Sequence, residues 1–140
     1  MRRTFVVVIG AVGLLLAAMP VLAHHAFDAE FDAKKPIKFT GTITKMEWIN
    51  PHAWIHIDVK GDDGKVTAWM IEGAAPNALL RRGWTKKSLL PGTVIVVEGF
   101  QAKNGMNRAN GSVITFTDGK KLFAGSSAGE PGAAPGAPRP

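Results

Sequence analysis

Hydrophobic and polar residues alternate along much of the chain after residue 36, which is the pattern of strands with one buried face. In residues 37–48 apolar positions lie two apart and are separated by lysine and threonine. The side of this segment that we expect to be buried has Ile37, Phe39, Gly41 and Ile43. Residues 53–60 alternate in the same way, with Ile55, Ile57 and Val59 on the expected inner side and Trp54, His56 and Asp58 on the outer side.

Turn and helix signals follow these two strands. Asp63-Gly64 predicts a hairpin that leads into a third strand over residues 66–72. A short helix is expected to begin at Pro76 or Asn77 and to end at Gly83, because proline favours the first helical turn and glycine favours the end.

Further strands are expected over residues 93–102 and 112–117, with a short returning arm over 120–123. Three strands, a helix and two more strands is the element order of the OB-fold, a small Greek-key barrel. The predicted fold is therefore mostly β: an OB-fold-like, five- to six-stranded antiparallel barrel with one short helix between strands three and four. An open antiparallel sheet with the helix on one face is the alternative.

The two ends of the chain differ in composition from this part. Residues 5–23 are strongly apolar, follow Arg2-Arg3 and end in Val-Leu-Ala, which predicts a signal peptide cleaved after Ala23. An uncleaved membrane anchor is the alternative, and the arginine pair loosely suggests a twin-arginine signal. The expected organisation is a signal peptide over residues 1–23, an N-terminal extension over 24–35, the OB-like domain over 36–124, and a flexible Gly/Pro/Ala-rich tail over 125–140.

Charge and cysteine content restrict the classes of partner. The 140-residue chain has a formal net charge of +6, and without residues 1–23 it has 15 basic and 11 acidic residues, a net charge of +4. This mild, scattered charge in an exported chain argues against nucleic acid as a partner. The chain has no cysteine, which excludes disulfides, a thiolate nucleophile and cysteine-ligated metal sites. We expect a periplasmic or secreted protein with no stable membrane insertion after signal cleavage.

Four segments of the chain have distinctive sequences: His24-His25-Ala26-Phe27, Trp48-Ile-Asn-Pro-His-Ala-Trp54, Pro76-Asn-Ala-Leu-Leu-Arg-Arg-Gly-Trp84 and Asn107-Arg-Ala-Asn110. In these segments the chain resembles a family of exported, periplasmic bacterial proteins of unknown function with an OB-like β-barrel. The resemblance covers nearly all of residues 24–123 and implies a fold and a compartment but no activity.

The expected cleavage after Ala23 creates a distinctive terminus. The mature chain would begin at His24-His25, with a free α-amine and two imidazoles in one small patch. Amine and imidazole nitrogens suit Cu(II), which is the strongest binder among the divalent first-row metals. Copper is therefore the candidate cofactor, with His52 or His56 as a further ligand; an incidental histidine pair without a metal is the alternative.

The outer side of the first two strands is the second candidate site. We expect a ligand face that combines Met46, Trp48, Trp54 and Asp58 with His56, while soft Met46 and Met70 would add affinity for Cu(I). The runner-up function is metal-free binding of a cell-envelope component or glycan through Trp48, Trp54 and His56, although tryptophans in such a barrel are more often core or rim residues than ligand platforms.

A catalytic site is not indicated by the sequence. Ser88 and Ser112 have no recognisable base nearby in the sequence pattern. The acidic residues on the predicted strands lie singly and are interpreted as solvated positions; they are Glu47, Asp58, Glu72 and Glu98. We therefore expect a non-catalytic binding domain.

Overall fold

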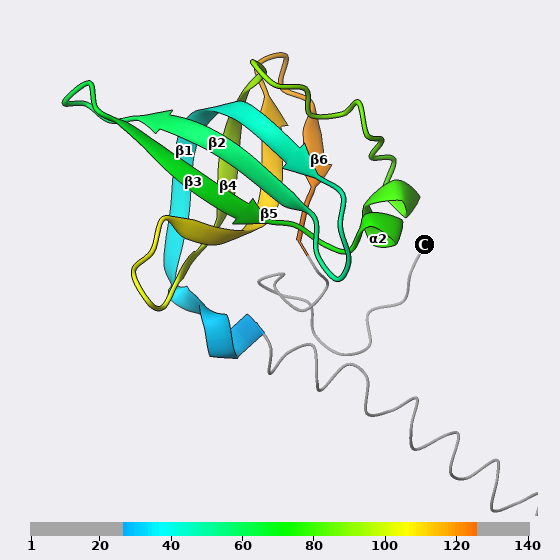
Figure 1. Ribbon diagram of the computed structural model, residues 1–140, viewed down its shortest axis with the longest axis horizontal. Helices are drawn as coiled ribbons and strands as arrows, with labels where there is room; N and C mark the ends of the chain where they lie inside the picture. Colours follow the sequence, from blue (N-terminus) through cyan, green and yellow to red (C-terminus); the bar gives the residue numbers. More distant parts are fainter. Residues whose placement is uncertain (1–26, 126–140) are drawn as a thin grey trace, which may run out of the picture.

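The strands of the protein form one sheet whose hydrogen bonding closes into a ring (Figure 1). The structure is a computed structural model that describes residues 27–125. A single helical turn over residues 27–30 comes first. The elements that follow are β1 (Phe31–Glu47), β2 (Trp54–Lys60), β3 (Val66–Glu72), α2 (Pro76–Arg81), β4 (Val94–Ala102), β5 (Arg108–Phe116) and β6 (Lys121–Phe123).

The strand order is that of the OB-fold. The six strands are arranged β3-β2-β1-β4-β5-β6, and an additional pairing of β3 with β5 closes the ring. The 17-residue β1 makes this possible, because its first part pairs with β4 and its second part pairs with β2. All neighbours are antiparallel except β3 and β5, which are parallel. The expected mostly β, barrel-like fold with a short helix between β3 and β4 is confirmed.

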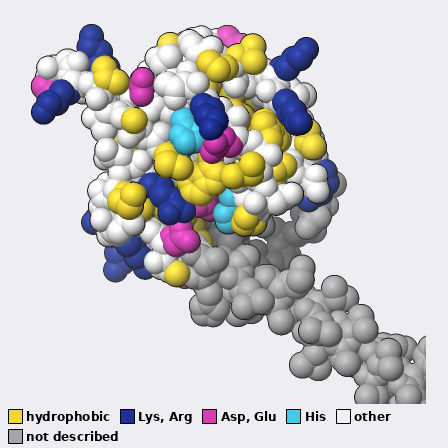
Figure 2. Space-filling model, in the orientation of Figure 1, with side chains coloured by type: hydrophobic (Ala, Val, Ile, Leu, Met, Phe, Trp, Pro, Cys, Tyr) yellow, Lys and Arg dark blue, Asp and Glu magenta, His cyan; other side chains and the backbone are white. Residues whose placement is uncertain are grey.

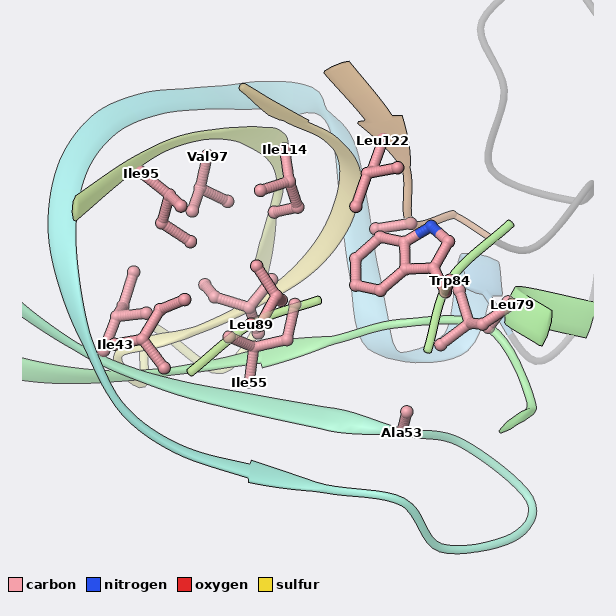
Figure 3. Close-up of a cluster of buried hydrophobic side chains, with 14 of the residues drawn as sticks. Ile43, Ala53, Ile55, Leu79, Trp84, Leu89, Ile95, Val97, Ile114 and Leu122 are labelled. Carbon is pink, nitrogen blue, oxygen red and sulfur yellow. The ribbon is translucent and has the colours of Figure 1, made fainter. Parts of the chain in front are cut away.

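Apolar residues from every strand fill the inside of the ring (Figure 3). Ile43 and Gly41 are buried, and Ile37 and Phe39 pack against the same core, as the period of two predicts. The connection from α2 to β4 also contributes. Its Trp84 and Leu89 are each 1% exposed, and Nε1 of Trp84 donates a hydrogen bond to the carbonyl of Phe123 at 3.1 Å.

In the second half of β1, the side chains do not follow the simple alternation of inward and outward positions. The β1–β2 register shifts between Ile43 and Lys45, a β-bulge that places one extra residue in β1. After the bulge, Met46 pairs with Ile55 and packs against the core. Trp48, which follows the end of the strand, also packs against the core. The prediction that Met46 and Trp48 share the outer face with Trp54 and His56 is therefore wrong.

The N-terminal segment packs on the sheet. Phe27 and Phe31 form a small second core with Ala102, and Phe100 packs against it. β1 accordingly begins at Phe31, before the expected start of the domain at residue 36, and its pairing with β4 is irregular between Phe31 and Pro36. The period of two is lost across this irregular stretch, which is why the sequence pattern does not show the early start.

Other element boundaries shift by a few residues. β5 begins at Arg108, four residues before the expected strand, and α2 ends at Arg81, so Gly83 lies two residues beyond it with a positive φ of 85°. Among residues 27–125, no helix has the length and apolar character needed to cross a membrane. The predicted signal peptide and nearly all of the predicted tail lie outside the described residues.

Candidate metal- and ligand-binding face

The outer side of β1, β2, β3 and β5 has two adjacent rows of polar and aromatic side chains. The strand register places Glu47, Trp54, Glu72 and Asn110 in one row, and Lys45, His56, Met70 and Arg108 in the next. Figure 2 shows histidine side chains on this face together with acidic, basic and hydrophobic ones. We refer to these two rows as the outer face.

The row that contains Trp54 also contains a buried carboxylate, that of Glu72. The side chain of Glu72 is 7% exposed, Nδ1 of His52 lies 2.9 Å from its Oε1, and Nη2 of Arg108 lies 3.2 Å from its Oε2. Burial raises the pKa of the Glu72 carboxyl above its ordinary value, although the charges of His52 and Arg108 act in the opposite direction. Glu72 is therefore a buried acid with two basic partners, and the interpretation of Glu72 as a solvated position is wrong.

Arg108 connects this carboxylate to the N-terminal segment. Its Nη2 donates hydrogen bonds to Glu30 at 2.7 Å and to Glu72 at 3.2 Å. Its guanidinium carbon lies 4.6 Å from the centre of the Trp54 ring and 5.6 Å from that of Phe31, both cation–π distances. One face of Trp54 is therefore occupied by Arg108 within the protein.

His56 has a separate acidic partner. Its Nε2 lies 3.1 Å from Oε2 of Glu47, and Oε1 of Glu47 accepts a hydrogen bond from Lys45. Lys45, and after it His56, hold the pKa of the Glu47 carboxyl below its ordinary value. The two described histidines thus contact different carboxylates, and Trp54 pairs across the sheet with both of those acidic residues.

The predicted metal ligands are only partly placed by the structure. His24 and His25 lie outside the described residues. Across residues 27–125, no three histidine, aspartate or glutamate side chains gather closely enough to hold a metal ion. Asp58 is on the outer side of β2, opposite Thr42 and Ala68, as the alternation predicts. Of the predicted ligand face, Trp54, His56 and Asp58 are on the outer side, and Met46 and Trp48 are not.

Sequence reasoning missed several residues of this face, among them Glu72, Arg108 and Asn110. Asn110 is 2% exposed, and among the described residues its Oδ1 has no hydrogen-bond partner. Arg108 and Asn110 belong to a segment that carries the family resemblance, which was an available signal. Their meeting with Glu72 depends on the β3–β5 pairing, a contact between distant parts of the chain that the alternation pattern does not reveal.

Comparison with known proteins identifies a family but no activity. The model of a family of unknown function, DUF6152, matches residues 11–111. No curated protein and no solved structure matches the chain. Since the match covers well over half of the 140 residues, the chain belongs to the DUF6152 family of unknown function.

Proposed function

We propose that the protein is an exported, non-catalytic domain that binds copper through His24, His25 and His52. The α-amine and imidazoles of a chain beginning at His24 supply nitrogen ligands that suit Cu(II), and His52 supplies one more. The export signal read from residues 1–23 creates that terminus and assigns the protein to the periplasm or the extracellular space.

The observation that carries the proposal is the contact of His52 with a buried carboxylate. Metal-binding histidines commonly have one ring nitrogen beside a carboxylate, which orients the ring and makes the other nitrogen a better ligand. Nδ1 of His52 lies 2.9 Å from Glu72, and the His52 side chain is 39% exposed. This arrangement leaves Nε2 as the nitrogen for a metal ion.

The packing of the N-terminal segment supports the same site. Phe27 packs against Phe31 and Phe100, with ring centres 5.7 and 5.8 Å apart. Arg108 lies over Phe31 and also contacts Glu72, which is the partner of His52. Three residues span at most about 11 Å, so the tether from Phe27 back to His24 is short.

The test is a Cu(II) titration of protein that begins at His24. One extra residue before His24 moves the α-amine away from the imidazole, and we expect it to weaken Cu(II) binding measurably. Glu72→Gln removes the charge beside His52 and should weaken binding by about tenfold, the usual effect of altering an outer partner of a metal ligand. Equal affinities for all three proteins would refute the proposed site.

His56→Gln is the matched control, because His56 also contacts a carboxylate but a different one. We expect His52→Gln to lower Cu(II) affinity and His56→Gln to leave it unchanged. Circular dichroism of each variant checks that the fold is retained. Equal losses for both histidines would contradict the assignment of His52.

A further inference from the structure

A hollow on the outer face brings together one histidine and two methionines. It has a volume of about 580 Å³ and lies between β2, β3 and the β4–β5 loop. His56, Met70 and Met106 are among the residues that line it. Their three side chains come from separate parts of the chain, so only the folded protein assembles them.

Backbone pairing brings two of the three residues opposite each other. His56 and Met70 are direct partners across β2 and β3, and both are on the outer face. The peptide N–H of Met70 also donates to the carbonyl of Asn107 at 3.0 Å, which brings the β4–β5 loop against β3. Met106 precedes Asn107 and therefore lies at the same edge of the hollow.

The loop that presents Met106 has its own hydrogen bonds. The peptide N–H of Met106 donates to Oδ1 of Asn104 at 3.1 Å, and Nδ2 of Asn104 lies 3.2 Å from the Met106 sulfur. Met106 is 59% exposed and Met70 is 39% exposed, so both side chains are accessible from solvent. Apolar side chains of this size are usually placed in the core, where they contribute burial energy.

The chemistry of the three side chains points to a soft cation. Thioether sulfur and imidazole nitrogen select Cu(I) over hard, oxygen-preferring ions such as Mg²⁺ and Ca²⁺. Nε2 of His56 is beside Glu47, which leaves Nδ1 for a metal. Lys45 is the cation nearest to His56 in the strand register, and its charge is offset by its hydrogen bond to Glu47.

We propose that His56, Met70 and Met106 form a Cu(I) site in this hollow. It uses none of the ligands of the His24–His25–His52 site, so it goes beyond the proposed function and can hold if that proposal fails. Protein with both sites would bind copper in either oxidation state, each at a site whose donors match it.

The test measures Cu(I) affinity, without oxygen, by competition with a chromogenic Cu(I) chelator. The sample is the protein recovered after export, whichever residue it begins with. We expect the double variant Met70→Leu/Met106→Leu to bind Cu(I) at least about tenfold more weakly, since direct ligands contribute no less than their outer partners. Met46→Leu is the matched control, because Met46 packs against the core and does not line the hollow.

A second measurement locates the bound ion. With ¹³C-labelled methionine methyl groups, Ag(I) serves as a redox-stable substitute for Cu(I), and we expect it to shift the NMR signals of Met70 and Met106 but not that of Met46. Unchanged Cu(I) affinity in the double variant, or Ag(I) shifts that leave Met70 and Met106 unaffected, would overturn the proposal. The extra residue before His24 tests the Cu(II) site, so a loss of Cu(II) binding in that variant does not change the interpretation of the Cu(I) and Ag(I) results.

Discussion

The guanidinium carbon of Arg108 lies 4.6 Å from the centre of the Trp54 ring. The same side chain reaches Glu30 and Glu72, so Arg108 joins β5 to β2, to β3 and to the helical turn at residues 27–30. Most of these contacts join parts of the chain far apart in sequence. Arg108 therefore connects the N-terminal segment to the outer face and donates a hydrogen bond to the buried carboxylate of Glu72.

Replacement of Arg108 should destabilise the protein through Glu72. In Arg108→Met the buried carboxylate loses a charged hydrogen-bond donor, and we expect the free energy of unfolding to fall by about 2 kcal/mol. Urea unfolding measures it. Lys38→Met is the control, because it breaks the ion pair of Lys38 with Glu98, in which the lysine side chain is 70% exposed. We expect this substitution to change the free energy of unfolding by less than about 1 kcal/mol.

A double-mutant cycle separates the charge from the packing. If the loss in Arg108→Met arises from the unpaired Glu72 carboxylate, Arg108→Met should cost less when Glu72→Gln is already present. Equal costs in the two backgrounds would show that Arg108 acts through its other contacts instead, which are with Glu30, Phe31 and Trp54.

Gly99 is a position where even a methyl group should not fit. A Cβ atom there would lie 2.0 Å from the carbonyl oxygen of Asn110, at the point where the β4–β5 register shifts. Because that atom is backbone, relief requires movement of β5, and we expect Gly99→Ala to lower stability by about 3 kcal/mol or more.

Gly73→Ala is the matched comparison for Gly99→Ala. A Cβ at Gly73 meets its nearest neighbour, the carbonyl oxygen of Ala124, at an ordinary 3.5 Å, and the φ of Gly73 is not positive. We expect this variant to unfold near the temperature of the parent protein. Thermal unfolding of the pair checks both expectations, and a Gly99→Ala protein as stable as Gly73→Ala would contradict the register.

The residues on the inner face of the ring could be predicted from sequence, because the alternation that places them there is a local property of each strand. Burial of every second residue constrains Ile43, Ile55 and Ile57 in the same way, whatever strand lies next to them. Met46 and Trp48 could not be placed by the same reasoning. The bulge before Lys45 changes the phase by one residue, and an extra residue in a strand is visible only once its pairing partner is known.

The candidate site was predicted less completely, since its key contacts join distant residues. The pattern of residues 53–60 identified Trp54 and His56 as outward residues. It could not indicate that Glu72 is buried, because that burial depends on β5 lying beside β3 and on the position of Arg108. Met106 had no assigned role for the same reason.

The segment between α2 and β4 offers a test of the core through two adjacent leucines. Leu89 is 1% exposed and belongs to the main core, whereas Leu90 is 54% exposed. Leu89→Ala should lower the free energy of unfolding by about 3 kcal/mol, in the usual range for deleting a buried leucine. Leu90→Ala should change it by less than about 0.5 kcal/mol, as for most surface substitutions. Chemical denaturation of both proteins measures the difference, and similar losses would show that this segment does not insert as described.

The ion pair of Lys38 with Glu98 should be visible as a pH effect. Nζ of Lys38 lies 2.8 Å from Oε1 of Glu98, and this hydrogen bond is the main cause that lowers the pKa of the Glu98 carboxyl. A lowered pKa in the folded state favours the ionised form, so the pair stabilises the protein above the ordinary glutamate pKa of about 4.3 and the stabilisation is lost as the pH falls below it. In Lys38→Gln we expect the pKa of Glu98 to rise toward its ordinary value.

Carboxyl ¹³C shifts followed by NMR from pH 2 to pH 7 measure this pKa directly. Glu47 is an internal reference, because its pKa is lowered by Lys45 and His56 and not by Lys38. The Lys38→Gln substitution should therefore shift the titration of Glu98 and leave that of Glu47 unchanged. If both carboxyls moved together, the cause would be the overall charge of the protein, whereas an unmoved Glu98 would show that the pair does not persist in solution.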